Sequence, residues 1–304
     1  WCCGRPGVAP LHGRVNNHLM KSSTHTLFRA GLGTLGLALS ATVCSQEATG
    51  AVAPAAAQPS PGFSWVLGGT LENSASYSGG SDRSTGLRPV IGLAVGRYTL
   101  STGGGGALLD RDLDARDASG LSTRLFQGGN LRLTGSLRID GGRKNSEEPL
   151  LRGLPDVRRT LRVRLGLVYD VNSQFSLRSS WSQDVLGRQG GATLNNTARY
   201  EFTLAPGTEL ALVAGAHLAN TTYLRSYFGV PGSAAGVTTA LPQFAPSGGM
   251  HSTEVGLDLR HNLHHHWVLL GGVRYSQLRG DARRSPLAIK PDNYSVSIGL
   301  AYRR

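Results

Sequence analysis

Short runs of the chain alternate apolar and polar residues strictly from about residue 120 to the carboxyl end. Between Leu161 and Tyr169 every odd position is apolar, whereas two arginines and a glycine lie among the even positions. The same period of two recurs in 131–139 and in 294–302. A period of two predicts β-strands whose two faces meet different surroundings. In a soluble sandwich the apolar face forms a core. In an outer-membrane barrel it meets lipid, and the polar face lines a closed interior.

The lengths of the connecting segments separate these two fold classes. About twelve strands are predicted, an even number, as in bacterial single-chain barrels. They lie near 63–75, 88–99, 107–115, 120–127, 130–140, 158–169, 174–184, 193–204, 208–220, 252–262, 266–277 and 293–302. Short turns alternate with longer segments, the turns at 127–130, 171–174, 204–208 and 261–266 and the longer segments at 141–157, 185–192, 221–251 and 278–292. Short periplasmic turns that alternate with long outer loops are typical of an outer-membrane barrel with both ends in the periplasm, whereas a sandwich gives no reason for this alternation.

Aromatic residues gather at both ends of the predicted strands. Those beside short turns are Tyr169, Phe175, Phe202, Trp267 and Tyr302. Those toward long loops are Trp181, Tyr223, Tyr275 and Tyr294. Amphipathic rings favour the headgroup level, so two girdles indicate a membrane barrel, although cross-strand packing in a soluble sheet is the plainer alternative. Together these patterns predict an all-β fold, a closed antiparallel transmembrane β-barrel of about 12 strands with short periplasmic turns and long outer loops.

Composition excludes a helical membrane protein. The 304 residues are 39% hydrophobic, and no run of about 18 apolar residues occurs beyond the amino end. We divide the chain into upstream residues plus a signal peptide at 1–45, a flexible Ala/Pro-rich lead-in at 46–62 and the barrel at 63–304. Within the first part Met20 is the more natural start, and basic residues precede an apolar stretch at 30–43, the layout of a secretory signal.

Processing and charge fit export to the outer membrane. Cleavage after Ser45 satisfies the small-residue rule, with sites near Ala53 or Ala57 as alternatives. The first 45 residues hold four basic residues and no acidic one, so the remaining chain carries 27 basic against 19 acidic residues. Export argues against nucleic acid as the partner, and favours outer-membrane lipid, acidic lipopolysaccharide, peptidoglycan or internal salt bridges. The cysteines, which predict no disulfide in the exported part, are Cys2, Cys3 and Cys44.

The alternation turns many charged residues toward the barrel interior. The predicted inward basic residues are Arg132, Arg138, Arg162, Arg164, Arg178, Arg199, Arg260 and Arg274. The acidic residues on the same faces are Asp140, Asp184, Glu201, Glu254 and Asp258. One interpretation is a pore that attracts anions. The interpretation we prefer is a salt-bridge network that fills a narrow barrel, because buried charges need partners.

Four motifs invite a chemical interpretation, and none predicts a metal, a cofactor or an enzyme. The turn His261–His266 holds four histidines, but neighbours in a tight turn splay apart, so a cationic patch at acidic pH suits it better than a metal site. His251 and Ser252 are neighbours and are expected on opposite faces of a strand, and inward His217 has no evident serine partner. The glycines at 103–106 are expected to form a flexible turn, and the acidic and basic run at 110–117 an exposed loop.

The segment Thr221–Met250 is the strongest candidate for a functional loop. It is long, and its aromatic residues and three prolines argue for folding back over the barrel mouth or into the lumen. The alternative interpretation is simple occlusion of the pore.

Two carboxyl-terminal segments resemble the MipA/OmpV family of outer-membrane proteins. One is Tyr227-Phe228-Gly229-Val230 followed by Ala234, Leu241, Phe244 and Gly248-Gly249. The other holds Trp267, Tyr275, Leu278, Gly280, Asp281, Ala282, Ser285 and Pro286. The resemblance covers most of 63–302. Such chains usually end in an aromatic residue, by which the assembly machinery recognises the last strand, whereas this one ends Tyr302-Arg303-Arg304. We expect either that Tyr302 takes this role two residues before the end or that assembly of the barrel is less efficient.

The resemblance implies a scaffold that links a lytic transglycosylase and a peptidoglycan synthase during murein assembly. Family relatives are also described as adhesins and surface antigens, so an adhesin is one alternative, and a channel for small anionic solutes is another. The periodicity itself predicts the barrel alone, because a fold does not determine a function.

Overall fold

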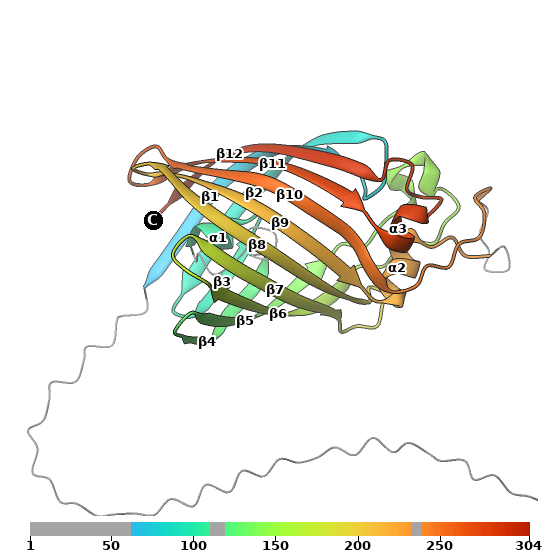
Figure 1. The fold of residues 1–304 in the computed structure, drawn as a ribbon, viewed down its shortest axis with the longest axis horizontal. Helices are drawn as coiled ribbons and strands as arrows, with labels where there is room; N and C mark the ends of the chain where they lie inside the picture. The colour runs from blue at the N-terminus through green and yellow to red at the C-terminus, as the bar shows by residue number, and fades with distance from the viewer. Residues whose placement is uncertain (1–61, 110–118, 233–238) are drawn as a thin grey trace, which may run out of the picture. The chain divides into compact units, whose positions relative to one another are not determined.

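Twelve antiparallel strands form the wall of a closed barrel in the computed structural model, which describes residues 62–109, 119–232 and 239–304 (Figure 1). The signal peptide, nearly all of the lead-in and the run at 110–117 lie outside these residues. The strands are β1 (Phe63–Ala75), β2 (Arg83–Val95), β3 (Tyr98–Thr102), β4 (Gly120–Gly128), β5 (Leu131–Asp140), β6 (Thr160–Asp170), β7 (Phe175–Asp184), β8 (Ala192–Ala205), β9 (Thr208–Ala219), β10 (Gly249–Asn262), β11 (Trp267–Leu278) and β12 (Asp292–Arg303).

Each strand pairs with its neighbours in chain order, and β1 pairs with β12 to close the barrel. This last ladder runs from Val66 opposite Arg303 to Asn73 opposite Val296. The Trp65 amide extends it by donating to the Arg304 carbonyl at 2.8 Å. A closed ladder lets backbone N–H and C=O groups of the wall bond to each other, which lipid requires because it offers no partners. The prediction of a closed antiparallel barrel is confirmed.

The two faces of the wall differ as the alternation predicts. On β10, Val255 and Leu257 point outward and are 50% and 44% exposed. Glu254, which directly precedes Val255, lies on the inner face and is 6% exposed. An apolar outer surface over a charged interior is the arrangement of a barrel in lipid rather than of a soluble sandwich.

The short and long connections lie at opposite ends of the barrel, as predicted. The chain ends of β1 and β12 share the end of the short turns, which is the periplasmic end by the general rule for such barrels. A ring cluster marks this end, with Tyr302 centred 5.4 Å from Trp65 and 5.3 Å from Trp267. At the other end Tyr223 is not part of a girdle, because it lies on a helix and stacks on Tyr227 at 4.5 Å.

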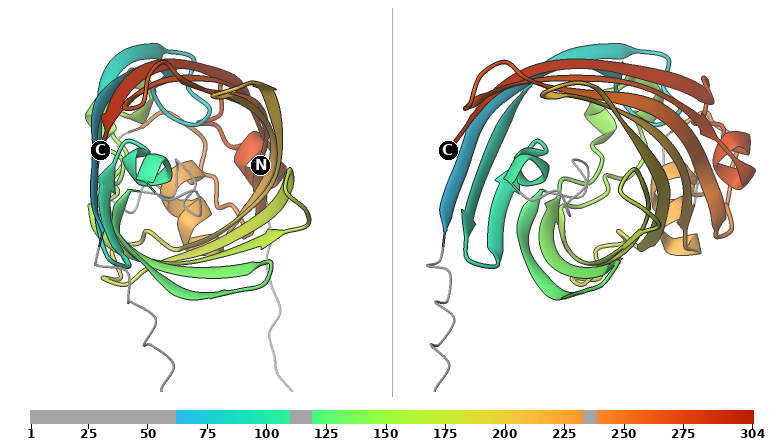
Figure 2. Two further views of the ribbon diagram at one scale, coloured as in Figure 1. Left: turned by 90° about the vertical axis from the view of Figure 1, so that its left-hand side faces the viewer. Right: turned by 60° about the vertical axis from the view of Figure 1, so that its left-hand side comes forward.

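The strand expected at 107–115 is wrong at 107–109, and its remaining residues lie outside the described ranges. Gly105–Leu109 forms the short helix α1, and Figure 2 shows α1 inside the barrel. Leu108 packs there in an apolar cluster with Val66, Val90, Val268 and Ala301. Glycine explains the departure: Gly103 adopts φ +56°, and a Cβ on Gly105 would lie 2.3 Å from the Ile91 carbonyl oxygen, so only glycines bring this helix so close to β2.

The strand expected at 88–99 spans a turn. β2 ends at Val95, and β3 begins at Tyr98. Gly96 adopts φ +57° in the turn between them. The single strand expected at 88–99 is therefore two strands, the second of which is the five-residue β3. The described barrel has twelve strands, as predicted, but β3 takes the place of the strand expected at 107–115.

The remaining helices belong to the long outer connections. They are α2 (Thr221–Phe228), α3 (Gly280–Arg284) and two 3₁₀ turns at Asn145–Glu147 and Pro149–Leu151. None of the helices in the described ranges is long and apolar enough to span a bilayer.

Candidate functional site

The long outer segments fold together into a cap with two apolar clusters. The first joins Leu224 and Phe228 of α2 to Leu278 and Ala282 near α3. The second joins Leu151, Leu154, Val230 and Leu287, which come from three different outer connections. Figure 2 shows α2 within the outline of the barrel at the end opposite the C-terminus. Buried apolar clusters indicate that these connections hold a defined structure rather than behaving as independent loops.

Hydrogen bonds fasten the cap across long sequence separations. The Ser285 hydroxyl donates to the Phe228 carbonyl at 2.6 Å, and the Tyr77 hydroxyl donates to the Leu287 carbonyl at 2.8 Å. Val230 and Phe244 exchange two backbone hydrogen bonds of 2.9 Å. The predicted functional segment 221–250 therefore folds back over the mouth, as expected, in its described parts. Residues 233–238, including Ala234, lie outside the described residues.

The residues that carry the resemblance fall into two groups in space. Those that meet in the cap are Tyr227, Phe228, Gly229, Val230, Leu278, Gly280, Asp281, Ala282, Ser285 and Pro286. Asp281 accepts a hydrogen bond from the Ser247 amide at 2.7 Å. Tyr275 lies on the outer surface of the wall and donates to Asp292 at 3.1 Å, and Trp267 lies at the far end beside Tyr302. The sequence segments are thus chiefly the components of one cap.

Burial raises the pKa values of several acidic side chains inside the cap. Burial and the nearby Glu148 carboxylate raise the pKa of Tyr77 to about 12. Burial also raises the pKa of Glu148, and that of Tyr227 above its ordinary value. Arg143, which is 5% exposed, donates to the Tyr227 carbonyl at 2.9 Å. These shifts disfavour charge on Tyr77, Tyr227 and Glu148.

Several of the predicted inward charges contact one another along the inner wall, between strands that are neighbours or one strand apart. Arg199 binds Glu201 at 2.8 Å and Asp258 at 3.0 Å, and Arg274 binds the same Asp258 at 2.8 Å. Arg162 binds Asp140 at 2.6 Å. Arg132 pairs with Asp170, an acidic residue that the sequence analysis did not single out. Arg164, Arg178 and Arg260 also have interactions. Asp184 accepts from the Gly190 amide at 2.9 Å, which fixes the loop after β7.

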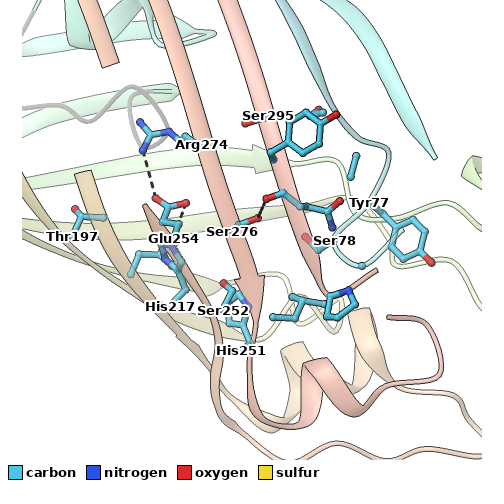
Figure 3. Close-up of a pocket in the computed structure, with 18 of the residues that line it drawn as sticks. Tyr77, Ser78, Thr197, His217, His251, Ser252, Glu254, Arg274, Ser276 and Ser295 are labelled. Carbon is cyan, nitrogen blue, oxygen red and sulfur yellow. Dashed lines mark hydrogen bonds and ion pairs between the residues drawn. The ribbon is translucent and has the colours of Figure 1, made fainter. Parts of the chain in front are cut away.

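A chamber of about 530 Å³ lies within the lumen and reaches the cap (Figure 3). Its wall includes His217, whose Nδ1 lies 3.0 Å from the Asn195 Oδ1 and whose Nε2 lies 3.6 Å from the Glu254 Oε2. Glu254 also lies 3.7 Å from Arg274. Figure 3 shows Glu254 between His217 and Arg274. Polar and charged groups therefore form much of this wall.

The expectation that His251 and Ser252 point to opposite faces is wrong, since both line the chamber. A shift in register between Met250 and Ser252 is the physical reason, because a bulge brings two successive side chains to one side. Ser252 lies opposite His217 across the β9–β10 pair. Within the described residues no hydrogen bond joins their side chains, and Glu254 occupies the Nε2 side of the ring. This is not the geometry of an activated serine.

The histidine turn at the periplasmic end splays apart. His264 and His265 meet edge to face at 4.9 Å and are exposed. His266 turns away, with its Nδ1 3.0 Å from the Arg303 carbonyl oxygen and its ring 5.3 Å from Tyr302. Nowhere in the described ranges do three potential metal ligands of the His, Cys, Asp or Glu type gather.

A family model described as MltA-interacting protein MipA matches residues 67–304. Solved structures with similar folds include an anion-selective porin from Comamonas acidovorans, with 10% identity, 81% of this chain and 99% of that chain covered, and a TM-score of 0.39. Another is a loop L8 deletion mutant of the outer membrane protein OmpT of Vibrio cholerae, with 10% identity, 80% and 98% coverage and a TM-score of 0.37. The KdgM porin has 7% identity, 78% and 98% coverage and a TM-score of 0.37. No curated protein matches the chain significantly.

Proposed function

The chain belongs to the MipA family of MltA-interacting proteins, and on this premise we propose that it is a non-enzymatic outer-membrane scaffold that holds a lytic transglycosylase near a peptidoglycan synthase. Family membership is the observation that carries the proposal. The match spans 67–304, nearly the whole barrel, and the family is described by its interaction with MltA. The scaffold works at the murein side of the membrane through the periplasmic face of the barrel.

The contents of the lumen support a scaffold over a channel. The outer end carries a cap with its own apolar clusters, and α1 packs inside the barrel nearer the periplasmic end. Two of the inward arginines, Arg162 and Arg199, are engaged by carboxylates. A salt-bridge network of this kind fills space and fixes the wall, and paired charges attract permeating anions weakly. A scaffold needs a rigid barrel and no open path.

The periplasmic turns are the contact surface in this proposal. Each is short and fixed by its strands, so it offers exposed side chains on a rigid base. At the β10–β11 turn His264, His265 and His266 are all exposed, but His266 also binds the Arg303 carbonyl. The first two are therefore the residues to change. The lead-in at 46–62 is a second contact in this proposal.

The alternative is a channel for small anionic solutes. The observation in its favour is the chamber itself, which includes Arg138, Arg178 and Arg274 in its wall. Such a channel has to pass α1, which packs inside the barrel, and the cap at its outer end.

Crosslinking in cells followed by affinity capture tests the scaffold. The unmodified protein should capture a lytic transglycosylase or a peptidoglycan synthase, and His264→Ser with His265→Ser should reduce that capture. Arg158→Ser, a change on an exposed residue of the outer loop before β6, is the matched control and should leave capture unchanged. Each barrel is first shown to be folded by its altered migration in unheated gels. Capture of lipopolysaccharide and assembly factors alone by the unmodified protein would end the scaffold proposal.

A further inference from the structure

The chamber is built from most of the barrel wall rather than from one loop. Eight strands contribute side chains to it, together with the loop 76–79. Its volume of about 530 Å³ lies within the range of small-molecule sites, roughly 300–1,000 Å³. Rigid strands position side chains more precisely than loops do, so a site built on them can recognise a ligand by its shape.

Short hydroxyl and amide side chains are frequent in the chamber lining. Seven serines, one threonine and two asparagines face it, whereas its aliphatic side chains are limited to Ala75, Leu278 and Pro291. Some of these polar groups are already engaged, as where the Ser276 hydroxyl donates to the Asn293 carbonyl at 3.4 Å. Side-chain hydroxyls and amides both donate and accept hydrogen bonds, so they match a ligand rich in the same groups. Such a lining suits a sugar better than an apolar compound.

Charge in the chamber favours an anionic group on that sugar. Three arginines and two glutamates line it. Both glutamates are engaged, Glu72 by Arg88 at 2.9 Å and Glu254 by His217 and Arg274. In the described part of the chain, the half-buried Arg138 makes no hydrogen bond or ion pair, in contrast to the other two arginines. A guanidinium matches a carboxylate with two parallel hydrogen bonds, so Arg138 is the group that would hold the anion.

We propose that the lumen chamber binds an acidic sugar, whose carboxylate is held by Arg138 and whose hydroxyl or amide groups bond to the serines and asparagines of the wall. The proposal does not rest on the scaffold, because no periplasmic turn takes part in it. Acidic sugars occur in murein, where a lactyl ether carries the carboxylate, and in acidic polysaccharides, where the carboxylate belongs to the sugar ring. The chamber chemistry is shared by both sources.

Isothermal titration of the full chain in mild detergent tests this proposal with three probes. N-acetylmuramic acid and N-acetylglucosamine differ only in the lactyl ether, and galacturonic acid represents the second source. Samples are incubated overnight so that slow entry past the cap does not conceal binding. We expect at least one acidic sugar to bind at least about tenfold more tightly than N-acetylglucosamine. Tighter binding of N-acetylmuramic acid would identify murein as the source, and tighter binding of galacturonic acid would identify an acidic polysaccharide.

Arg138→Gln should weaken binding of the acidic sugar about tenfold. Arg158→Gln, on the exposed outer loop, removes the same charge away from the chamber and should bind as the unmodified protein does. Folding of both variants is verified by heat-dependent migration. The proposal is overturned if an intact barrel binds no acidic sugar, if the neutral sugar binds equally well, or if Arg138→Gln binds unchanged. None of these results alters the capture experiment, so the two proposals fail separately.

Discussion

The hydroxyl of Ser285 donates a 2.6 Å hydrogen bond to the carbonyl oxygen of Phe228, and both residues are buried. The two residues are 57 positions apart and belong to different outer connections. The same hydroxyl accepts from the Leu287 amide at 3.1 Å. One serine thus ties α2 to the segment after α3. The two sequence segments that carry the family resemblance meet at this bond.

Ser285→Ala should loosen the cap while leaving the barrel closed. The change leaves the buried Phe228 carbonyl without its donor, which costs about 1–3 kcal/mol. Limited proteolysis should cut the outer connections faster, and the unheated protein should still migrate as a folded barrel. Ser247→Ala, on an exposed serine of the same cap, is the control and should be cut at the unmodified rate. Equal rates for both variants would mean that the bond does not fasten the cap.

Cap stability should depend on pH through Glu148. Burial raises its pKa in the folded cap above its unfolded value, so the folded cap favours the protonated carboxyl. The contribution to stability is fully present below the unfolded pKa and is lost as the pH rises through the folded pKa. An acid-tolerant protease should therefore cut the cap more slowly below the unfolded pKa of Glu148 than above its folded pKa. Glu148→Gln should remove that part of the dependence, and an unchanged pH profile in this variant would contradict the assignment.

Asp258 should be the most sensitive carboxylate of the lumen network. It accepts from both Arg199 and Arg274, so Asp258→Asn leaves two guanidinium groups with weaker partners. Because its side chain is 27% exposed, we expect a loss of about 2 kcal/mol rather than the full effect of a buried pair. Glu201→Gln is the control, because this more exposed carboxylate binds Arg199 alone and should cost less than about 1 kcal/mol. The temperature at which the gel shift disappears measures both, and equal shifts would refute the ranking.

His266 should matter for barrel closure, unlike its two neighbours. Its ring lies against Tyr302, and its Nδ1 faces the Arg303 carbonyl oxygen at 3.0 Å, so it fastens the end of β12. His266→Ser should lower the unfolding temperature by the equivalent of about 1 kcal/mol. His264→Ser with His265→Ser should leave it unchanged, because these two exposed rings pack edge to face on each other. A larger fall of the unfolding temperature in the double variant than in His266→Ser would contradict the structural role of His266.

The wall could be predicted from the sequence because lipid and lumen impose a strict period of two on each strand. From β4 onward the predicted strands lie within a few residues of those observed, as at Phe175–Asp184 and Thr208–Ala219. The prediction failed where glycines interrupt the pattern. Residues 107–109 resemble the start of a strand by their apolar side chains, but Gly103 and Gly105 turn the chain inward as α1.

The cap and the chamber could be predicted only in part. Aromatic residues and prolines in 221–250 indicated folding back over the mouth, but no local period reveals that Val230 packs beside Leu287. Inward arginines followed from the alternation, whereas the opposition of His217 and Ser252 needed the register of β9 on β10, and the bulge beside Met250 leaves no sequence signal.

Planar-bilayer recording of the purified protein tests most directly whether ions can pass through the lumen. We expect that they cannot if the protein is a scaffold with a capped lumen. We expect silence or rare, small openings, because the cap, α1 and the paired charges obstruct the path. Removal of the Ser285 hydroxyl should make such openings more frequent. A steady anion-selective conductance of the unmodified protein, reduced by Arg138→Gln, would contradict closure and establish the channel in place of the scaffold.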